Sequence, residues 1–121
     1  MIKILCIENE KEQRIEIVDA LTTEGFEVIE AHSASAGLKL ILSEPIDLIL
    51  CDRMMGGKSG YTLLEEIRKN HPDKENIPFV FLTGLDDRRD RLATAHLHPA
   101  AYITKPFEVT LLIEKIRSLT N

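Results

Sequence analysis

Residues 48–52 read Leu-Ile-Leu-Cys-Asp, a short apolar run that ends at a carboxylate, and this pattern decides the fold class. A run of this length with polar residues at its ends is typical of a strand that is buried on both faces. Three further runs have the same form, and they cover residues 3–7, 78–82 and 101–104. Several doubly buried strands in one chain predict a parallel sheet that is covered by helices on both sides.

Each of these runs stops at a polar residue that chemistry could use. The stops are Glu8 with Asn9, then Asp52, Thr83, and Lys105 followed by Pro106. If the strands are parallel neighbours, their carboxyl ends lie at one edge of the sheet, which is where open α/β sheets bind ligands. Carboxylates, an amide, a hydroxyl and an ammonium group would then meet in one cleft. Such a set suits a divalent cation and a phosphoryl group.

Segments with helical periodicity lie between the strand runs. The expected helices cover residues 10–24, 33–43, 59–70, 86–96 and 108–119, and a short strand is expected at 26–30. The apolar stripes expected to face the core contain Ile15, Val18 and Leu21 in the first helix and Leu38, Ile41 and Leu42 in the second. Gly25 is the expected stop of the first helix, and Ser59 is the expected N-cap of the third.

This alternation predicts five β-α units in an α/β fold, a three-layer sandwich with a five-stranded parallel sheet in the middle. Right-handed crossovers leave few topologies, and the flavodoxin-like strand order 2-1-3-4-5 is preferred among them. That order places Glu8 and Asn9 beside Asp52, at the switch point between the first and third strands. The 121 residues are expected to form a single domain over residues 1–121.

Charge and hydropathy exclude several classes of function. The net charge is −5 and no basic run is present, so direct binding to nucleic acid is not expected. The apolar stretches span only a few residues, so no transmembrane helix and no membrane partner are expected. Met1 leads directly into a strand, which leaves no room for a signal peptide and predicts a cytoplasmic protein.

Competing motifs fail on inspection of their spacing. Cys6 and Cys51 are the only cysteines, and without C-x-x-C spacing we interpret them as buried free thiols. Residues 57–59 mimic the end of a phosphate-binding loop, but Asp52 stands where that loop needs a glycine. The histidines lack the H-E-x-x-H spacing of a zinc site and are expected at the surface. They are His32, His71, His96 and His98.

Asp52 is the leading candidate for a reacting residue. A carboxylate that ends a buried strand beside Glu8 is costly, because like charges repel unless a cation or proton intervenes. Mg²⁺ would relieve this repulsion, since it favours oxygen ligands and commonly uses one or two carboxylates plus a substrate phosphate. Asp52 could then act as an oxygen nucleophile and form an aspartyl phosphate. Lys105 can pair with phosphoryl oxygens as a point charge, and its bond to Pro106 is one where a cis peptide is accessible.

The ordered set of segments resembles the receiver domain of two-component response regulators, the CheY-like family, over nearly the whole chain. The matching segments are residues 4–10, 47–55, 57–60, 79–84 and 102–107. The resemblance implies a (βα)5 fold and the transfer of phosphate, with Mg²⁺, from a histidine kinase or a histidine phosphotransfer protein to an aspartate. It implies a signalling switch rather than an enzyme that turns over a separate substrate.

By this resemblance, seven residues carry the function. They are the phospho-acceptor Asp52, the metal-site residues Glu8, Asn9, Asp52 and Met54 (through its backbone carbonyl), and the phosphoryl-binding or switch residues Thr83, Lys105 and Tyr102. Thr83 would move toward the phosphoryl group and free space for Tyr102 to turn inward. That movement would bias the face formed by the fourth helix, the fifth strand and the fifth helix, where a downstream protein or output domain would bind.

Three positions depart from the usual pattern of the family. Asn9 stands where a carboxylate usually contacts Mg²⁺, so weaker metal binding is expected. Gly56 replaces a proline, and His98-Pro99 replaces a Gly-Ala pair before the last strand. Asn9 keeps open a second interpretation, a constitutive protein-interaction module that is not phosphorylated. A third interpretation, a metal-dependent phosphohydrolase for small substrates, lacks a visible general acid.

Overall fold

The computed structural model of the chain describes residues 1–53, 59–84 and 88–121. Met54 and Gly56, named above, lie outside these residues. The strands are β1 (Lys3–Ile7), β2 (Glu27–Ala31), β3 (Leu48–Asp52), β4 (Phe79–Thr83) and β5 (Ala101–Thr104). The helices are α1 (Lys11–Thr23), α2 (Ala34–Ser43), α3 (Gly60–Asn70), α4 (Arg88–Thr94) and α5 (Val109–Thr120). Two short 3-10 turns, η1 (Pro72–Lys74) and η2 (Ala95–Leu97), follow α3 and α4.

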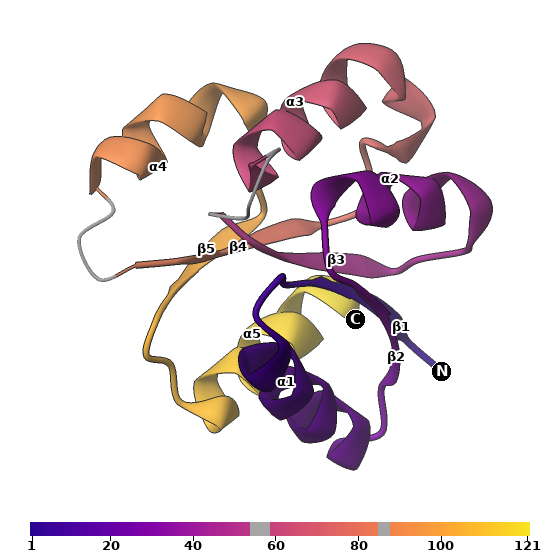
Figure 1. Ribbon diagram of the computed structural model, residues 1–121, viewed down its shortest axis with the longest axis vertical. Helices are drawn as coiled ribbons and strands as arrows, with labels where there is room; N and C mark the ends of the chain where they lie inside the picture. The colour runs from indigo at the N-terminus through magenta and orange to yellow at the C-terminus, as the bar shows by residue number, and fades with distance from the viewer. Residues whose placement is uncertain (54–58, 85–87) are drawn as a thin grey trace.

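The strands form one parallel sheet with the order β2-β1-β3-β4-β5, which confirms the predicted topology. The register pairs Ile7 with Cys51 and Asp52 with Leu82. All strands run in the same direction, so their carboxyl ends lie along one edge of the sheet (Figure 1). The predicted polar stops follow or occupy these ends.

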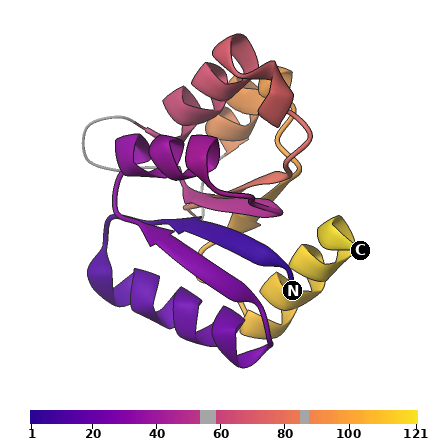
Figure 2. The ribbon, with the colours of Figure 1, turned by 90° about the vertical axis from the view of Figure 1, so that its right-hand side faces the viewer.

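Helices cover both faces of the sheet, as predicted, and divide the core into two layers (Figures 1 and 2). One apolar cluster lies between the sheet and α2 and α3, and it includes Ile7, Cys51 and Leu63. The other lies between the sheet and α1 and α5, and it includes Cys6 and Leu112. Successive strand residues alternate between the two clusters, because side chains along a strand point to opposite faces.

The predicted stripe of α1 and that of α2 were each wrong at one position. Ile15 is 45% exposed and Leu42 is 46% exposed. In α1 the buried residues are Ile17 and Leu21, and Ile15 is rotated by about 200° from Ile17 around the helix.

Small residues explain the error in α2. Its buried positions are Ala34, Gly37 and Ile41, so two of the three buried residues of the helix are small. A Cβ atom on Gly37 would lie 2.5 Å from Cδ1 of Ile7. With Gly37 against the sheet, Leu42 lies about 140° further around the helix and faces solvent. None of the helices in the described ranges has the length and apolar character needed to cross a lipid bilayer.

The two cysteines are buried free thiols, as predicted, and they lie on opposite faces of the sheet. Burial is the main cause that raises the pKa of the Cys6 thiol to about 12. Burial also raises the pKa of Cys51 well above its ordinary value. The histidines are exposed except His71, which is half-buried.

Candidate functional site

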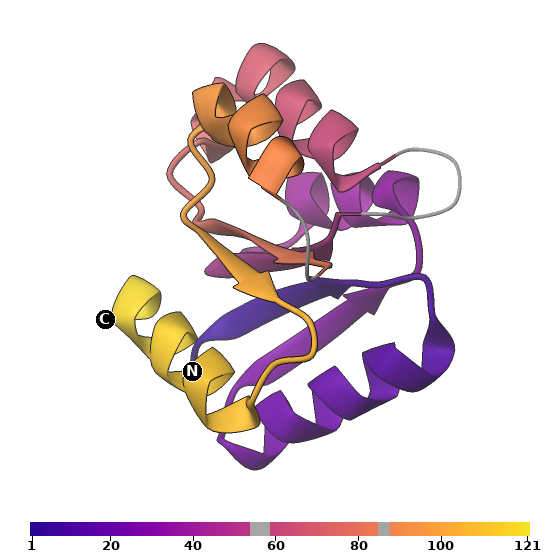
Figure 3. The same ribbon diagram turned by 90° about the vertical axis from the view of Figure 1, so that its left-hand side faces the viewer.

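A cluster of charged side chains lies at the carboxyl edge of the sheet. In Figure 3 this is the edge toward which the strand arrows point. Nζ of Lys105 lies 3.2 Å from Oδ2 of Asp52 and 3.4 Å from Oε2 of Glu8. Three of the residues selected from the sequence are therefore in direct contact, although 97 positions separate Glu8 from Lys105. The lysine forms a cationic bridge between two carboxylates at the switch point of the sheet.

Glu8 is held deep in this cluster. It is 1% exposed, and its Oε1 accepts a hydrogen bond from the backbone N–H of Glu10 at 3.2 Å. Its backbone carbonyl accepts a 2.7 Å hydrogen bond from Nη1 of Arg14. Burial, followed by the hydrogen bond and negative charge of Asp52, raises the pKa of Glu8 to about 7, although Lys105 opposes the shift. The carboxylate pair is therefore set to hold a proton or a cation near neutral pH.

The start of α3 fixes the end of β3, and so fixes Asp52. The backbone N–H of Gly60 donates a 3.0 Å hydrogen bond to the carbonyl of Arg53. A Cβ atom on Gly60 would lie 2.6 Å from the carbonyl oxygen of Asp52, so the position requires glycine. Ser59 caps the helix, as predicted, because its Oγ accepts from the N–H of Thr62 at 3.1 Å.

Thr83 ends β4 and is 2% exposed. Its Oγ1 donates a long hydrogen bond of 3.5 Å to the carbonyl of Ile103, so a stronger acceptor could readily replace this partner. The backbone carbonyl of Thr83 accepts a 2.7 Å hydrogen bond from the N–H of Lys105. The Lys105–Pro106 peptide bond is cis, the form that the sequence left accessible.

Lys105 has a third partner that sequence reasoning missed. Oε1 of Gln13, in α1, accepts a hydrogen bond from Nζ of Lys105 at 2.7 Å. A polar residue on a partly exposed helix is the default in any sequence, so no signal marked Gln13.

Tyr102 is surrounded by an aromatic ring, hydroxyl groups and one guanidinium group. Its ring stacks on Phe81 with 5.8 Å between ring centroids. The guanidinium of Arg91, in α4, lies 5.0 Å from the centroid of the Tyr102 ring. Its hydroxyl lies 2.5 Å from Oγ1 of Thr94 and donates to the carbonyl of Arg91 at 3.3 Å. Nη2 of Arg91 also donates to Oγ1 of Thr104 at 2.8 Å. From the sequence, Tyr102 was a candidate but Thr94 and Arg91 were not, because the α4 segment is weakly amphipathic and gave no pattern that marks single residues.

The loop before β5 carries His98 at the position where the family usually has glycine, as the sequence indicated. His98 has φ 54° and adopts the left-handed conformation, which costs a residue with a Cβ more than it costs glycine. Arg68 of α3 fixes the loop by donating from Nε to the carbonyl of Leu97 at 2.8 Å and from Nη2 to that of His98 at 3.1 Å. A third bond joins Nη1 of Arg68 to the carbonyl of Glu75 at 3.2 Å.

The oxygen donors at this edge fit a magnesium ion. Glu8 and Asp52 supply two adjacent carboxylates whose repulsion a cation would relieve, and the exposed amide of Asn9 follows Glu8 directly. Within residues 1–53, 59–84 and 88–121, no group of three or more acidic, histidine or cysteine side chains could hold a metal. Any metal site here would therefore depend on two carboxylates and neutral donors.

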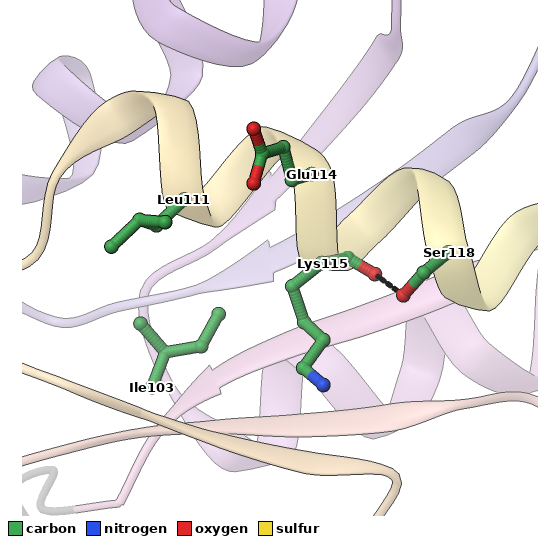
Figure 4. Close-up of a pocket in the computed structure, with 5 residues that line it drawn as sticks. All are labelled: Ile103, Leu111, Glu114, Lys115 and Ser118. Carbon is green, nitrogen blue, oxygen red and sulfur yellow. Dashed lines mark hydrogen bonds between the residues drawn. The ribbon is translucent and has the colours of Figure 1, made fainter.

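Two grooves lie on either side of β5, one against α5 and the other against α4 and the loop that precedes β5. One, of about 400 Å³, lies between β5 and α5, and Figure 4 shows its lining. It is lined by Ile103, Leu111, Glu114, Lys115 and Ser118. The other, of about 480 Å³, is lined by Arg91, Leu92, Ala95, His98, Pro99 and Tyr102. Tyr102 thus lines a groove on the face that the sequence predicted for partner binding.

Comparison with known proteins gives consistent matches over the chain. The family model described as "Response regulator receiver domain" matches residues 4–117. Transcriptional activator protein IrlR of Burkholderia pseudomallei is 33% identical over 117 residues, covering 97% of this chain and 49% of the relative. Response regulator RR06 of Streptococcus pneumoniae is 34% identical over 116 residues, covering 96% and 52%. This chain therefore spans about half the length of these two relatives.

A solved structure, that of the Francisella response regulator 1452 receiver domain, superposes with a TM-score of 0.90 at 27% identity. The superposition covers 99% of this chain and 97% of that one.

Proposed function

The chain belongs to the receiver domain family of two-component response regulators, and from this membership we propose that it accepts a phosphoryl group on Asp52 and acts as a switch. The observation that carries the proposal is the bridge from Nζ of Lys105 to Asp52 and Glu8. It places a cation beside the proposed nucleophile and a second carboxylate beside both. The donor of the phosphoryl group would be a histidine kinase or a histidine phosphotransfer protein.

The proposed transfer forms one bond and breaks another. A carboxylate oxygen of Asp52 attacks phosphorus, while the bond from phosphorus to the donor histidine breaks and its electron pair stays on the imidazole, which is then protonated. Lys105 pairs with the oxygens of the arriving group, and the hydroxyl of Thr83 exchanges its long bond to Ile103 for one of them. Mg²⁺, held by Glu8, Asp52, Asn9 and the backbone carbonyl of Met54, would supply further positive charge at the phosphoryl group.

The switch would follow from the new charge. Phosphorylation adds about −1.5 to −2 charge at neutral pH. Movement of Thr83 toward that charge would alter the space beside Tyr102, whose hydroxyl contacts Thr94 in α4. The equilibrium of the α4-β5-α5 face would shift, and a downstream protein or an output domain would bind one of its two states. We propose a cytoplasmic location, a single domain over residues 1–121 and no direct contact with nucleic acid.

A second candidate is a constitutive interaction module that is not phosphorylated. Asn9 favours it, because this chain offers the metal one carboxylate fewer than the usual site. The two candidates differ in the effect of restoring the charge. If Asn9 only weakens the metal site of a working receiver, Asn9→Asp should tighten Mg²⁺ binding by roughly tenfold, the order expected from added ligand charge. In an interaction module without a metal site, the same change should leave Mg²⁺ binding undetectable.

The deciding experiment is intact-mass spectrometry after incubation with Mg²⁺ and acetyl phosphate. We expect the wild type to gain one phosphoryl group, and Asp52→Asn, the matched control, to gain none. Omission of Mg²⁺ should also prevent the gain. No gain by the wild type, either with acetyl phosphate or with a phosphorylated histidine kinase as donor, would reject the switch and favour the interaction module.

A further inference from the structure

The ammonium group of Lys105 has three N–H donors, and three acceptors from the described part of the chain surround it. They are Oδ2 of Asp52 at 3.2 Å, Oε2 of Glu8 at 3.4 Å and Oε1 of Gln13 at 2.7 Å. The shortest of these contacts is to Gln13, which is the neutral member of the set. It also comes from α1, which lies outside the sequence segments that carry the resemblance to the receiver family.

The three acceptors differ in what the proposed phosphorylation does to them. Asp52 would lose its negative charge, and one of its two oxygens, when that oxygen bonds to phosphorus, and Glu8 would be drawn toward a bound cation. The amide of Gln13 takes part in neither change. Its bond to Lys105 can therefore persist from the resting protein to the phosphorylated one.

An anchor of this kind matters because lysine is a compact charge on a flexible stem. The side chain of Lys105 is 22% exposed, so part of it has access to water. Without Gln13, the ammonium could follow either carboxylate or turn toward solvent. A displacement of about 1 Å at a reacting centre can cost up to about a hundredfold in rate.

We infer that Gln13 is a positioning residue that holds the ammonium of Lys105 where the transferred phosphoryl group arrives. The inference rests on the proposed function. During transfer from acetyl phosphate, the Asp52 oxygen bonds to phosphorus and acetate leaves with the electron pair of the broken P–O bond. Lys105 then exchanges its contact with Asp52 Oδ2 for a phosphoryl oxygen, and keeps its contact with Gln13.

The test compares Gln13→Met, which keeps the length of the side chain but removes the acceptor, with Glu16→Gln, a change at an exposed position of the same helix. With Mg²⁺ and acetyl phosphate, the rate constant for phosphorylation should fall by roughly tenfold in Gln13→Met, a coupling typical of residues in contact. It should not change in Glu16→Gln. Gln13→Ala serves as a second variant should the methionine perturb α1, and the thermal midpoint is measured for each variant.

Two further readouts separate positioning from a general structural effect. In a Lys105→Ala background, Gln13→Met should change the rate by less than about twofold, because the ammonium that Gln13 positions is gone. Nitrogen-15 NMR of the Lys105 ammonium should show protection from exchange in the wild type and lose it in Gln13→Met.

The outcomes are distinct. A wild type that takes no phosphate overturns the proposed function and this inference with it. A phosphorylated wild type matched in rate by Gln13→Met and Gln13→Ala overturns only the inference. The same tenfold loss in the Lys105→Ala background also overturns it, since the effect would not depend on the Lys105 ammonium.

Discussion

The cluster around Asp52 and the environment of Tyr102 are neighbours that are held together by different forces. Around Asp52, one ammonium bridges two carboxylates, so the arrangement depends on charge. Around Tyr102, ring stacking and hydroxyl contacts dominate, although the guanidinium of Arg91 lies over the ring. Under the proposed function, the phosphoryl group would act directly on the first region. If the proposed switch operates, charge would trigger it at Asp52, and packing and hydrogen bonds around Tyr102 would set the free energy needed to change its state.

The largest expected effect comes from removing the bridge. Lys105→Ala leaves two adjacent carboxylates without their cation, and we expect its phosphorylation rate with acetyl phosphate and Mg²⁺ to fall by about a hundredfold. Near-ultraviolet circular dichroism should be unchanged, because Tyr102 has no part in the bridge. A variant that reacts as fast as the wild type would show that the bridge is irrelevant to transfer.

The next effect is a dependence of stability on pH. The pKa of Glu8 is raised from 4.5 to about 7, so between these values the folded protein keeps a proton that the unfolded chain has lost. This contribution to stability is complete below pH 4.5 and is lost as the pH rises through about 7.

Urea unfolding without Mg²⁺, in the presence of a chelator, measures this dependence. From pH 5 to pH 8 the wild type should lose more stability than Glu8→Gln, whose amide does not titrate. Parallel losses in the two proteins would contradict the shifted pKa.

A smaller effect is expected in the region of Tyr102. Thr94 is 1% exposed, and Thr94→Val removes the hydroxyl that lies 2.5 Å from that of Tyr102. We expect a loss of about 1 kcal/mol in the free energy of unfolding. The phosphorylation rate should stay within about twofold of the wild type, since no charge is altered. Thr110→Val, at an exposed position of α5, is the control. A large drop in phosphorylation rate for Thr94→Val would show that the Tyr102 environment and the Asp52 cluster are not energetically separate.

The smallest expected effect concerns the loop that leads to Tyr102. His98→Gly should raise the free energy of unfolding by about 0.5 kcal/mol, because glycine adopts φ 54° without the steric cost of a Cβ. His98→Ala keeps the Cβ and should bring no gain. Equal changes in the two variants, measured by urea unfolding, would mean that the backbone conformation is not what limits this loop.

The sequence predicted the sheet and the grouping of polar residues at its carboxyl edge well, because both depend on short-range patterns. Four apolar runs with polar ends were enough to place Glu8, Asp52 and Lys105 in one cleft once the strand order was known. The apolar stripes were less reliable, because Gly37 brings α2 close to the sheet by having no side chain and so carries no hydrophobic signal.

The contacts that the sequence did not predict are made by long polar side chains. Gln13 reaches Lys105 across 92 positions of sequence, and Arg68 reaches loop carbonyls about 30 positions away. Neither residue differs in type from a solvated helix residue. Their roles depend on the three-dimensional distance alone, which no local pattern encodes.

The two thiols give the protein a separate reporter in each half of its core. Cys6 faces α1 and α5, and Cys51 faces α2 and α3. Because burial keeps both thiols protonated, an alkylating reagent reacts with each only when the layer above it opens. The ratio of the two labelling rates would show whether the helix layers detach together or one at a time.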